Sequence, residues 1–281
     1  MQEGKFSRTA QRVAIRRAAH QVLDHPRVLD DPLALRIIGA ETAEELRSNP
    51  KENHKFSRAF RAFMAARSRY AEDELARAVA NGVMQYVVLG AGLDTFPYRN
   101  PYPELRVFEV DHPATQAWKR EQLQAAGIMV PSSLTFVPID FERETLADGL
   151  ESAGFGDGAA AFFSWLGVTP YLTCEACMST LSFIAKMPAD SGVVFDFAID
   201  PALLNAGQRE ALDALSKRVA AAGEPFQLFF DPAKLQAELR GMGFRRTEFL
   251  QGKELNARYF KDRKDGLLVR GGMGHLMAAW V

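Results

Sequence analysis

A run of apolar residues that stops at two glycines constrains this chain more than any other feature. Residues 86–89 read Tyr-Val-Val-Leu and lead directly into Gly90-Ala91-Gly92. Such a run indicates a buried strand, and the glycines permit a tight turn against which a ligand can lie with no Cβ in between. The spacing begins like the dinucleotide fingerprint, but Thr95 stands where its third glycine belongs. The pattern predicts either a nucleotide-type site or an ordinary turn at the end of a strand.

Two further predicted strands each end in an aspartate. Residues 105–110 lead into Asp111, and residues 134–139 lead into Asp140. In an open parallel sheet the carboxyl ends of the strands share the edge where ligands bind, and an acid after the second strand accepts hydrogen bonds from ribose hydroxyls. Either aspartate alone is better explained as the cap of a following helix. A glycine turn, an acid and an acid in series favour a nucleoside site.

Strands and helices continue to alternate over the rest of the chain. The later strands are expected at residues 160–165, 193–197, 244–250 and 274–281, the last two as a terminal antiparallel pair. This alternation predicts an α/β fold with a doubly wound, mostly parallel seven-stranded sheet. We expect residues 1–80 to form an N-terminal helical cover. Residues 81–281 are expected to form the binding domain, with a helical insert near 201–230.

An arginine continues an apolar helical stripe. Phe56, Phe60 and Phe63 fall on one face of a predicted helix, and Arg67 comes four residues later on the same face. Arg69 lies roughly 200° around that helix. Because an inward-facing guanidinium requires an anion, Arg67 is expected to meet either a carboxylate of the protein or the carboxylate of a ligand, which suits its forked geometry.

Composition excludes several classes of function. Lys and Arg together number 34 and Asp and Glu 35, for a net charge of −1, which gives no electrostatic case for binding nucleic acid or an anionic membrane surface. The longest apolar stretch, residues 159–168, is too short to span a bilayer, and residues 1–20 contain no apolar signal segment. The histidines show no metal-ligand spacing. These observations predict a cytoplasmic protein with no metal.

Several segments together carry a family resemblance. They are Ala66-Arg67-Ser68-Arg69, Leu89-Gly90-Ala91-Gly92-Leu93-Asp94-Thr95, Phe108-Glu109-Val110-Asp111-His112-Pro113, Pro138-Ile139-Asp140-Phe141 and Pro170-Tyr171-Leu172-Thr173. With them, the chain resembles the class I S-adenosylmethionine-dependent methyltransferases, and specifically the leucine carboxyl methyltransferases and their bacterial relatives. The resemblance covers nearly the whole chain.

The resemblance implies S-adenosyl-L-methionine as the cofactor and assigns residues to its parts. Arg67 would hold the methionine carboxylate, and Gly90 and Gly92 would let the backbone approach the cofactor. Asp111 would accept hydrogen bonds from the ribose hydroxyls. Asp140 would accept from the adenine amino group, and Phe141 beside it would pack on the adenine ring.

One departure from the family pattern follows the fourth strand. The family usually carries an acidic pair such as Ala-Glu there, whereas this chain has Ser164-Trp165. Ser164 is therefore expected to contact the cofactor through its hydroxyl, and no carboxylate contact to the methionine amino group is assigned. Tyr171 is the candidate for lining the acceptor site, with a packed loop aromatic as the alternative.

The expected reaction is transfer of a methyl group to a small-molecule carboxylate or hydroxyl by in-line displacement. Two alternatives remain open. The first is a catalytically degenerate module that still binds the cofactor, which Ser164 in place of an acid favours. The second is an NAD(P)-dependent oxidoreductase, against which the missing third glycine and Arg67 argue. The acceptor is the only partner expected, and the sequence does not predict an oligomeric state.

Overall fold

A single mixed sheet of seven strands organises the computed structural model, which describes residues 7–48, 55–140, 144–221, 223–270 and 274–281. The strand order is β3-β2-β1-β4-β5-β7-β6, and β7 alone runs antiparallel to its neighbours. The strands are β1 Gln85–Leu89, β2 Arg106–Asp111, β3 Leu134–Pro138, β4 Ala161–Trp165, β5 Gly192–Phe197, β6 Arg246–Leu250 and β7 His275–Trp280. The predicted fold class and the terminal antiparallel pair are confirmed.

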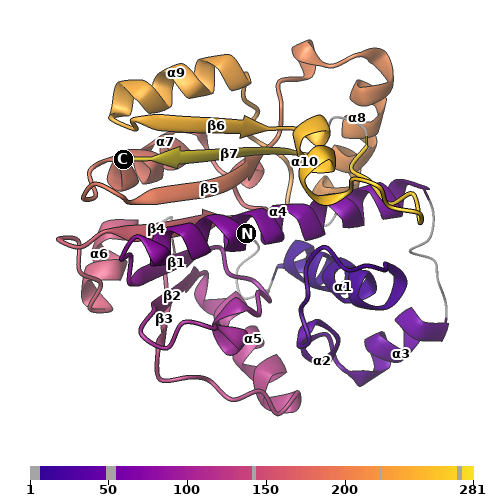
Figure 1. The fold of residues 1–281 in the computed structure, drawn as a ribbon, viewed down its shortest axis with the longest axis horizontal. Helices are drawn as coiled ribbons and strands as arrows, with labels where there is room; N and C mark the ends of the chain where they lie inside the picture. The colour runs from indigo at the N-terminus through magenta and orange to yellow at the C-terminus, as the bar shows by residue number, and fades with distance from the viewer. Residues whose placement is uncertain (1–6, 49–54, 141–143, 222, 271–273) are drawn as a thin grey trace.

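Helices cover both faces of this sheet and one of its edges. They are α1 Arg8–Leu23, α2 Ala34–Ile37, α3 Ala40–Ser48, α4 Lys55–Ala80, α5 Pro113–Ala125, α6 Leu146–Ser152, α7 Cys174–Ala185, α8 Ala206–Ala220, α9 Pro232–Met242 and α10 Gly252–Tyr259. Figure 1 shows α1, α2, α3 and α8 beyond the end of the sheet toward which the β6 arrow points. The carboxyl ends of the parallel strands therefore face a layer of helices.

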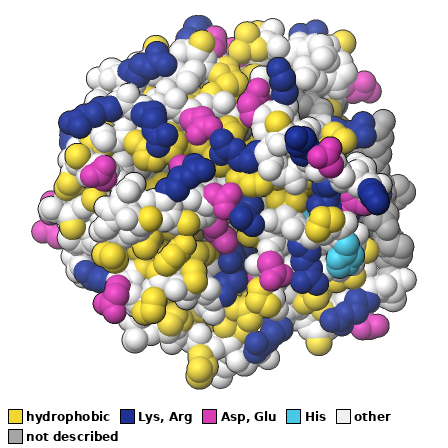
Figure 2. All heavy atoms as spheres, in the orientation of Figure 1, with side chains coloured by type: hydrophobic (Ala, Val, Ile, Leu, Met, Phe, Trp, Pro, Cys, Tyr) yellow, Lys and Arg dark blue, Asp and Glu magenta, His cyan; other side chains and the backbone are white. Residues whose placement is uncertain are grey.

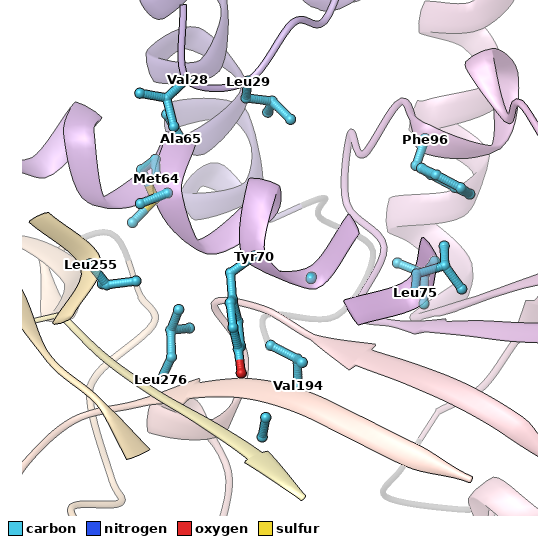
Figure 3. Packing of buried hydrophobic residues seen from close by; sticks show 14 of the residues in the cluster. Val28, Leu29, Met64, Ala65, Tyr70, Leu75, Phe96, Val194, Leu255 and Leu276 are labelled. Carbon is cyan, nitrogen blue, oxygen red and sulfur yellow. The ribbon is translucent and has the colours of Figure 1, made fainter. Parts of the chain in front are cut away.

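Apolar side chains fill the space on both faces of the sheet. On one face, Tyr70 points from α4 toward the strands, with Val194 of β5 and Leu276 of β7 close by (Figure 3). On the other face, Phe195 of β5 belongs to a second buried cluster together with Leu181 of α7. Because both faces are covered, the central strands are almost continuously apolar, as the sequence shows.

Helix α4 carries the stripe that places an arginine inside the protein. Phe63 is 6% exposed and Arg67 5% exposed, whereas Arg69 lies on the surface beside Asp73. The predicted inward orientation of Arg67 is confirmed. The side chain of Phe56, which opened the predicted stripe, lies outside the described residues.

The surface drawn in Figure 2 mixes charges of both signs, with basic and acidic side chains interspersed across this face. In the described ranges, no helix is long and apolar enough to cross a membrane.

Candidate functional site

The glycine turn after β1 is closed against two other segments. Gly90 has φ +65° and Gly92 φ +46°, the left-handed region that glycine tolerates best. A Cβ built on Gly90 would lie 2.3 Å from a methyl carbon of Val168, in the loop after β4. A Cβ on Gly92 would lie 3.0 Å from the Cβ of Ala10 in α1. Both glycines are therefore needed for the close approach of these segments as well as for the turn.

Asp111 ends β2 directly beside this turn. Its Oδ2 accepts a hydrogen bond from the Gly92 N–H at 2.6 Å, and its Oδ1 accepts from the His112 N–H at 2.7 Å. Burial raises the pKa of Asp111 above its ordinary value, and the two backbone donors act in the opposite direction. Since a carboxylate has about four acceptor positions, Asp111 can still accept from two ribose hydroxyls.

Asp140 follows β3 and lies next to Asp111 along the sheet edge. The N–H of Ile139 donates to the backbone oxygen of Asp111 at 3.0 Å. The backbone oxygen of Asp140 accepts from the Glu144 N–H at 2.9 Å. Phe141, predicted to pack on the adenine ring, lies outside the described residues.

Arg67 meets a carboxylate that is distant in sequence. Its Nη1 donates to Oδ2 of Asp196 at the end of β5, 129 residues away. Oδ1 of Asp196 accepts from the Gly167 N–H at 2.5 Å, and a Cβ on Gly167 would lie 3.0 Å from Arg67 Nη2. Nε of Arg67 is buried and has no hydrogen-bond partner within the described part of the chain. The guanidinium of Arg67 thus donates to Asp196 through Nη1, while its Nε has no acceptor among the described residues.

Ser164 lies within β4, below the sheet edge. Ser164 pairs in register with Val88 of β1 and with Val194 of β5, and it is 2% exposed. The hydroxyl of Tyr86 donates to Ser164 Oγ at 2.7 Å. The structure therefore gives this hydroxyl a protein partner, and a contact between Ser164 and a cofactor stays a prediction.

Tyr171 closes the 3₁₀ turn Thr169–Tyr171 after β4. Its N–H donates to the Val168 backbone oxygen at 3.0 Å, and its ring centroid lies 5.3 Å from that of Phe226. Burial raises the pKa of Tyr171 to about 12, so the phenol stays protonated at neutral pH. Tyr171 can thus donate a hydrogen bond but cannot serve as a base there.

Helix α1 ties the N-terminal helices to the same edge, a connection that sequence reasoning missed. Arg17 donates to Asp94 at 3.2 Å and to Thr95 at 2.9 Å, both in the turn after β1, and to Asp31 at 2.6 Å. The Thr9 N–H donates to Glu224, in the segment after α8, at 3.1 Å. No local pattern in the sequence identifies these partners.

The structure brings most of the predicted site residues together. Gly92 contacts Asp111 directly, while Gly90 packs on Val168, whose neighbour Gly167 packs on Arg67. Asp196 was also missed, because it lies inside the predicted strand 193–197, whereas Asp111 and Asp140 directly follow their predicted strands. Among the described residues, no group of three or more His, Cys, Asp or Glu side chains is placed to hold a metal ion.

Comparisons with solved structures agree with this architecture. A Thermobifida fusca protein named as a putative methyltransferase superimposes with a TM-score of 0.59 at 13% sequence identity, covering 99% of this chain and 96% of that one. A DUF574 family protein from Streptomyces avermitilis gives a TM-score of 0.54 at 14% identity, covering 95% and 96%. The sheet and its helices are therefore a Rossmann-like methyltransferase fold.

Sequence comparisons identify the family. The model of the leucine carboxyl methyltransferase family matches residues 10–185. The Bacillus subtilis protein YktD, named as a putative S-adenosyl-L-methionine-dependent methyltransferase, is 34% identical over 95% of each chain. A Saccharopolyspora erythraea protein with the same description is 33% identical over 64% of this chain and 63% of its own length. The chain belongs to the leucine carboxyl methyltransferase family, as its resemblance implied.

Proposed function

We propose that this chain is an S-adenosyl-L-methionine-dependent methyltransferase that acts on an oxygen atom of a small molecule. The observation that carries the proposal is a buried arginine with a free donor beside a glycine turn and a strand-end acid. Arg67, the Gly90–Gly92 turn and Asp111 together supply groups for a carboxylate, a backbone approach and ribose hydroxyls. The names of the relatives support the same cofactor.

The residues present fit this cofactor at both of its ends. Arg67 Nε is a buried donor without a partner among the described residues, and the carboxylate of an amino acid supplies an acceptor for it. Asp111 retains acceptor capacity beyond its two backbone partners. Asp140, at the next strand end, is our candidate for the adenine amino group. Ser164 is our candidate for a hydroxyl contact.

The chemistry demands little of the chain beyond position. When bound, S-adenosyl-L-methionine supplies a sulfonium methyl group that is already activated toward nucleophiles. The chain must align the acceptor with that methyl and exclude water. Helix α1 suits the second task, because Ala10 packs on Gly92 and Arg17 holds the turn after β1 through Asp94.

Tyr171, which is protonated at neutral pH as an ordinary tyrosine is, is compatible with a carboxylate acceptor. A carboxylate is ionised at neutral pH and needs no base, whereas a hydroxyl benefits from one. Because Tyr171 stays protonated, it suits a hydrogen-bond donor that orients an acceptor oxygen. We therefore place the acceptor beside the turn Thr169–Tyr171 and near Phe226.

Calorimetric titration tests the cofactor assignment. The wild-type chain is expected to bind S-adenosylmethionine and S-adenosylhomocysteine but not NAD. Arg67→Ala should weaken the binding of S-adenosylmethionine and of S-adenosylhomocysteine. Arg69→Ala, which removes an exposed arginine from the same helix, should leave both affinities unchanged. Asp111→Ala should cost about 1–3 kcal/mol of binding free energy, the range for losing a partner of buried polar groups. Binding of NAD alone would overturn the proposal.

A product assay tests the acceptor class. Methyl-labelled S-adenosylmethionine is incubated with the chain and with separate panels of small carboxylic acids and phenols. A methyl ester releases its label as volatile methanol in mild base, and a methyl ether does not. Base-labile label from the acid panel is the expected result. Tight cofactor binding with no transfer to either panel would favour a degenerate binding module.

A further inference from the structure

A buried acid at the carboxyl end of β5 has no role in the function described so far. Asp196 is 6% exposed, and both of its carboxylate oxygens are engaged, one by Arg67 and one by the Gly167 N–H at 2.5 Å. Its backbone oxygen accepts from the Thr169 hydroxyl at 2.6 Å. Asp196 therefore lies between the arginine proposed for the cofactor and the loop proposed for the acceptor.

We propose that Asp196 receives the α-ammonium group of the cofactor, so that Arg67 and Asp196 together form a receptor for a zwitterionic amino acid. This inference rests on the proposed function. It assigns Asp196 to the contact with the methionine amino group, for which the sequence offers no acid because Ser164 stands where the family usually carries one. The ligand chemistry is an α-amino acid whose carboxylate faces Arg67 and whose ammonium faces Asp196.

The charges at the site suit such a ligand. Because Arg67 is already neutralised by Asp196, a lone carboxylate approaching Arg67 would meet the negative charge of Asp196. A ligand with an ammonium next to its carboxylate balances both charges, since each group then faces its opposite. The same pair would disfavour an analogue that keeps the carboxylate and lacks the amino group.

Asp196 also has the capacity for a further partner. A carboxylate has about four acceptor positions, and Arg67 and Gly167 use two of them. Gly167 has φ +78°, and in this conformation its N–H donates to Asp196 while its Cα packs against the guanidinium of Arg67. The acid is thus held in place by the backbone rather than by side-chain contacts alone.

Other acids near the sheet edge are committed to cations of the protein. Asp94 pairs with Arg17, Glu72 with Arg99, and Glu109 with Lys119. Asp196 is paired as well, and it differs from these three acids in that its cation, Arg67, is also the residue proposed to hold the cofactor carboxylate.

Three ligands separate the amino-acid end of the cofactor from its nucleoside. They are S-adenosylhomocysteine, its analogue without the amino group, 5′-S-(3-carboxypropyl)-5′-thioadenosine, and 5′-methylthioadenosine, which lacks the whole amino-acid end. Calorimetry on the wild-type chain should show S-adenosylhomocysteine binding at least tenfold tighter than the desamino analogue. Equal affinity of the wild type for these two ligands would overturn the inference without any variant.

Asp196→Asn keeps the shape of the side chain and removes its charge. It should weaken S-adenosylhomocysteine at least tenfold, leave 5′-methylthioadenosine unchanged, and leave the desamino analogue unchanged or tighter. Asp200→Asn, at a half-buried neighbour that caps residues 201–203, serves as the control and should change the affinity for none of the three ligands.

The two failures are distinguishable. Equal weakening of S-adenosylhomocysteine and the desamino analogue in Asp196→Asn would assign Asp196 a structural role only and overturn the inference. A wild-type chain that binds none of the three nucleosides would instead overturn the proposed function, and the inference with it.

Discussion

Gly90 and Val168 fix the distance between the turn after β1 and the loop after β4. A Cβ on Gly90 would lie 2.3 Å from the Val168 side chain, closer than real Cβ atoms approach. We expect Gly90→Ala to cost about 1–2 kcal/mol from its left-handed backbone and about 1–3 kcal/mol from overpacking. Because the two loops would separate, cofactor affinity should fall as well. Urea unfolding and calorimetry measure the two effects.

Gly82 offers a matched control for this variant. It has φ +93°, and a Cβ there would meet nothing within 4 Å. Gly82→Ala should therefore show the backbone cost alone and leave cofactor affinity unchanged. The double variant Gly90→Ala/Val168→Ala should recover part of the lost stability. If Gly90→Ala proves no worse than Gly82→Ala, the packing argument is wrong.

The Tyr86–Ser164 hydrogen bond allows the predicted contact of Ser164 to be tested. A hydroxyl that accepts one bond can still donate its own, so Ser164 keeps one donor for the cofactor. Ser164→Ala should weaken S-adenosylhomocysteine binding by about two- to tenfold, equivalent to about 0.5–1.5 kcal/mol. Tyr86→Phe, which removes the other half of the bond, is expected to leave binding unchanged. Equal effects of the two variants would indicate that Ser164 acts only within the sheet.

The sequence predicted those parts of the site that follow from local patterns. The strands end where apolar runs meet glycine or aspartate, so Gly90, Gly92, Asp111 and Asp140 were found at the carboxyl edge. The helical period of the phenylalanine stripe placed Arg67 inside the protein.

Contacts between distant segments could not be predicted in this way. Asp196 is 129 residues from Arg67, and only the strand order brings β5 to α4. The neighbour of Ser164 depends on the register of β1 with β4, which pairs Ser164 with Val88 and places Tyr86 two pairs away. The polar segment after residue 41 contains the helix α3, Ala40–Ser48, whose buried Ala43 and Leu46 gain stability from tertiary packing that the local composition does not reveal.

Phe229 provides a test of the acceptor site. Its ring lies 6.4 Å from Phe226, which in turn packs on Tyr171, so the aromatic segment after α8 reaches the turn beside the proposed acceptor. Phe229→Trp should change the range of accepted substrates, because a larger ring alters the packing of the aromatic segment beside the proposed acceptor. Affinity for S-adenosylhomocysteine should remain as in the wild type. Loss of cofactor affinity in equal measure would contradict this placement.

His275 predicts how stability depends on pH. Burial lowers its pKa to about 4, and its ring stacks on Phe249 with Nδ1 unpartnered among the described residues. Because the unfolded chain takes up this proton near pH 6.5, stability should be lost as pH falls from about 6.5 to about 4. His275→Phe should remove this loss and gain about 2 kcal/mol at pH 5 relative to pH 7.5. Urea unfolding at the two pH values measures this difference in stability, and His25→Gln, which changes an exposed histidine, is the control. If the stability of His275→Phe and of the wild type depended on pH in the same way, His275 would not be the cause of the loss.

The Glu109–Lys119 pair predicts a destabilisation that depends on charge rather than on packing. Lys119 Nζ lies 2.5 Å from Glu109 Oε1, both side chains are buried, and burial raises the pKa of Glu109 to about 7. Lys119→Met should cost about 3–5 kcal/mol at pH 8, since it leaves a buried carboxylate without its cation. The lost stability should be smaller at pH 5, where Glu109 becomes protonated. The double variant Glu109→Gln/Lys119→Met should recover most of the lost stability at either pH.

Lys186→Met, at the exposed end of α7, is the control. If the loss of stability in Lys119→Met did not vary with pH, the loss would be assigned to packing instead.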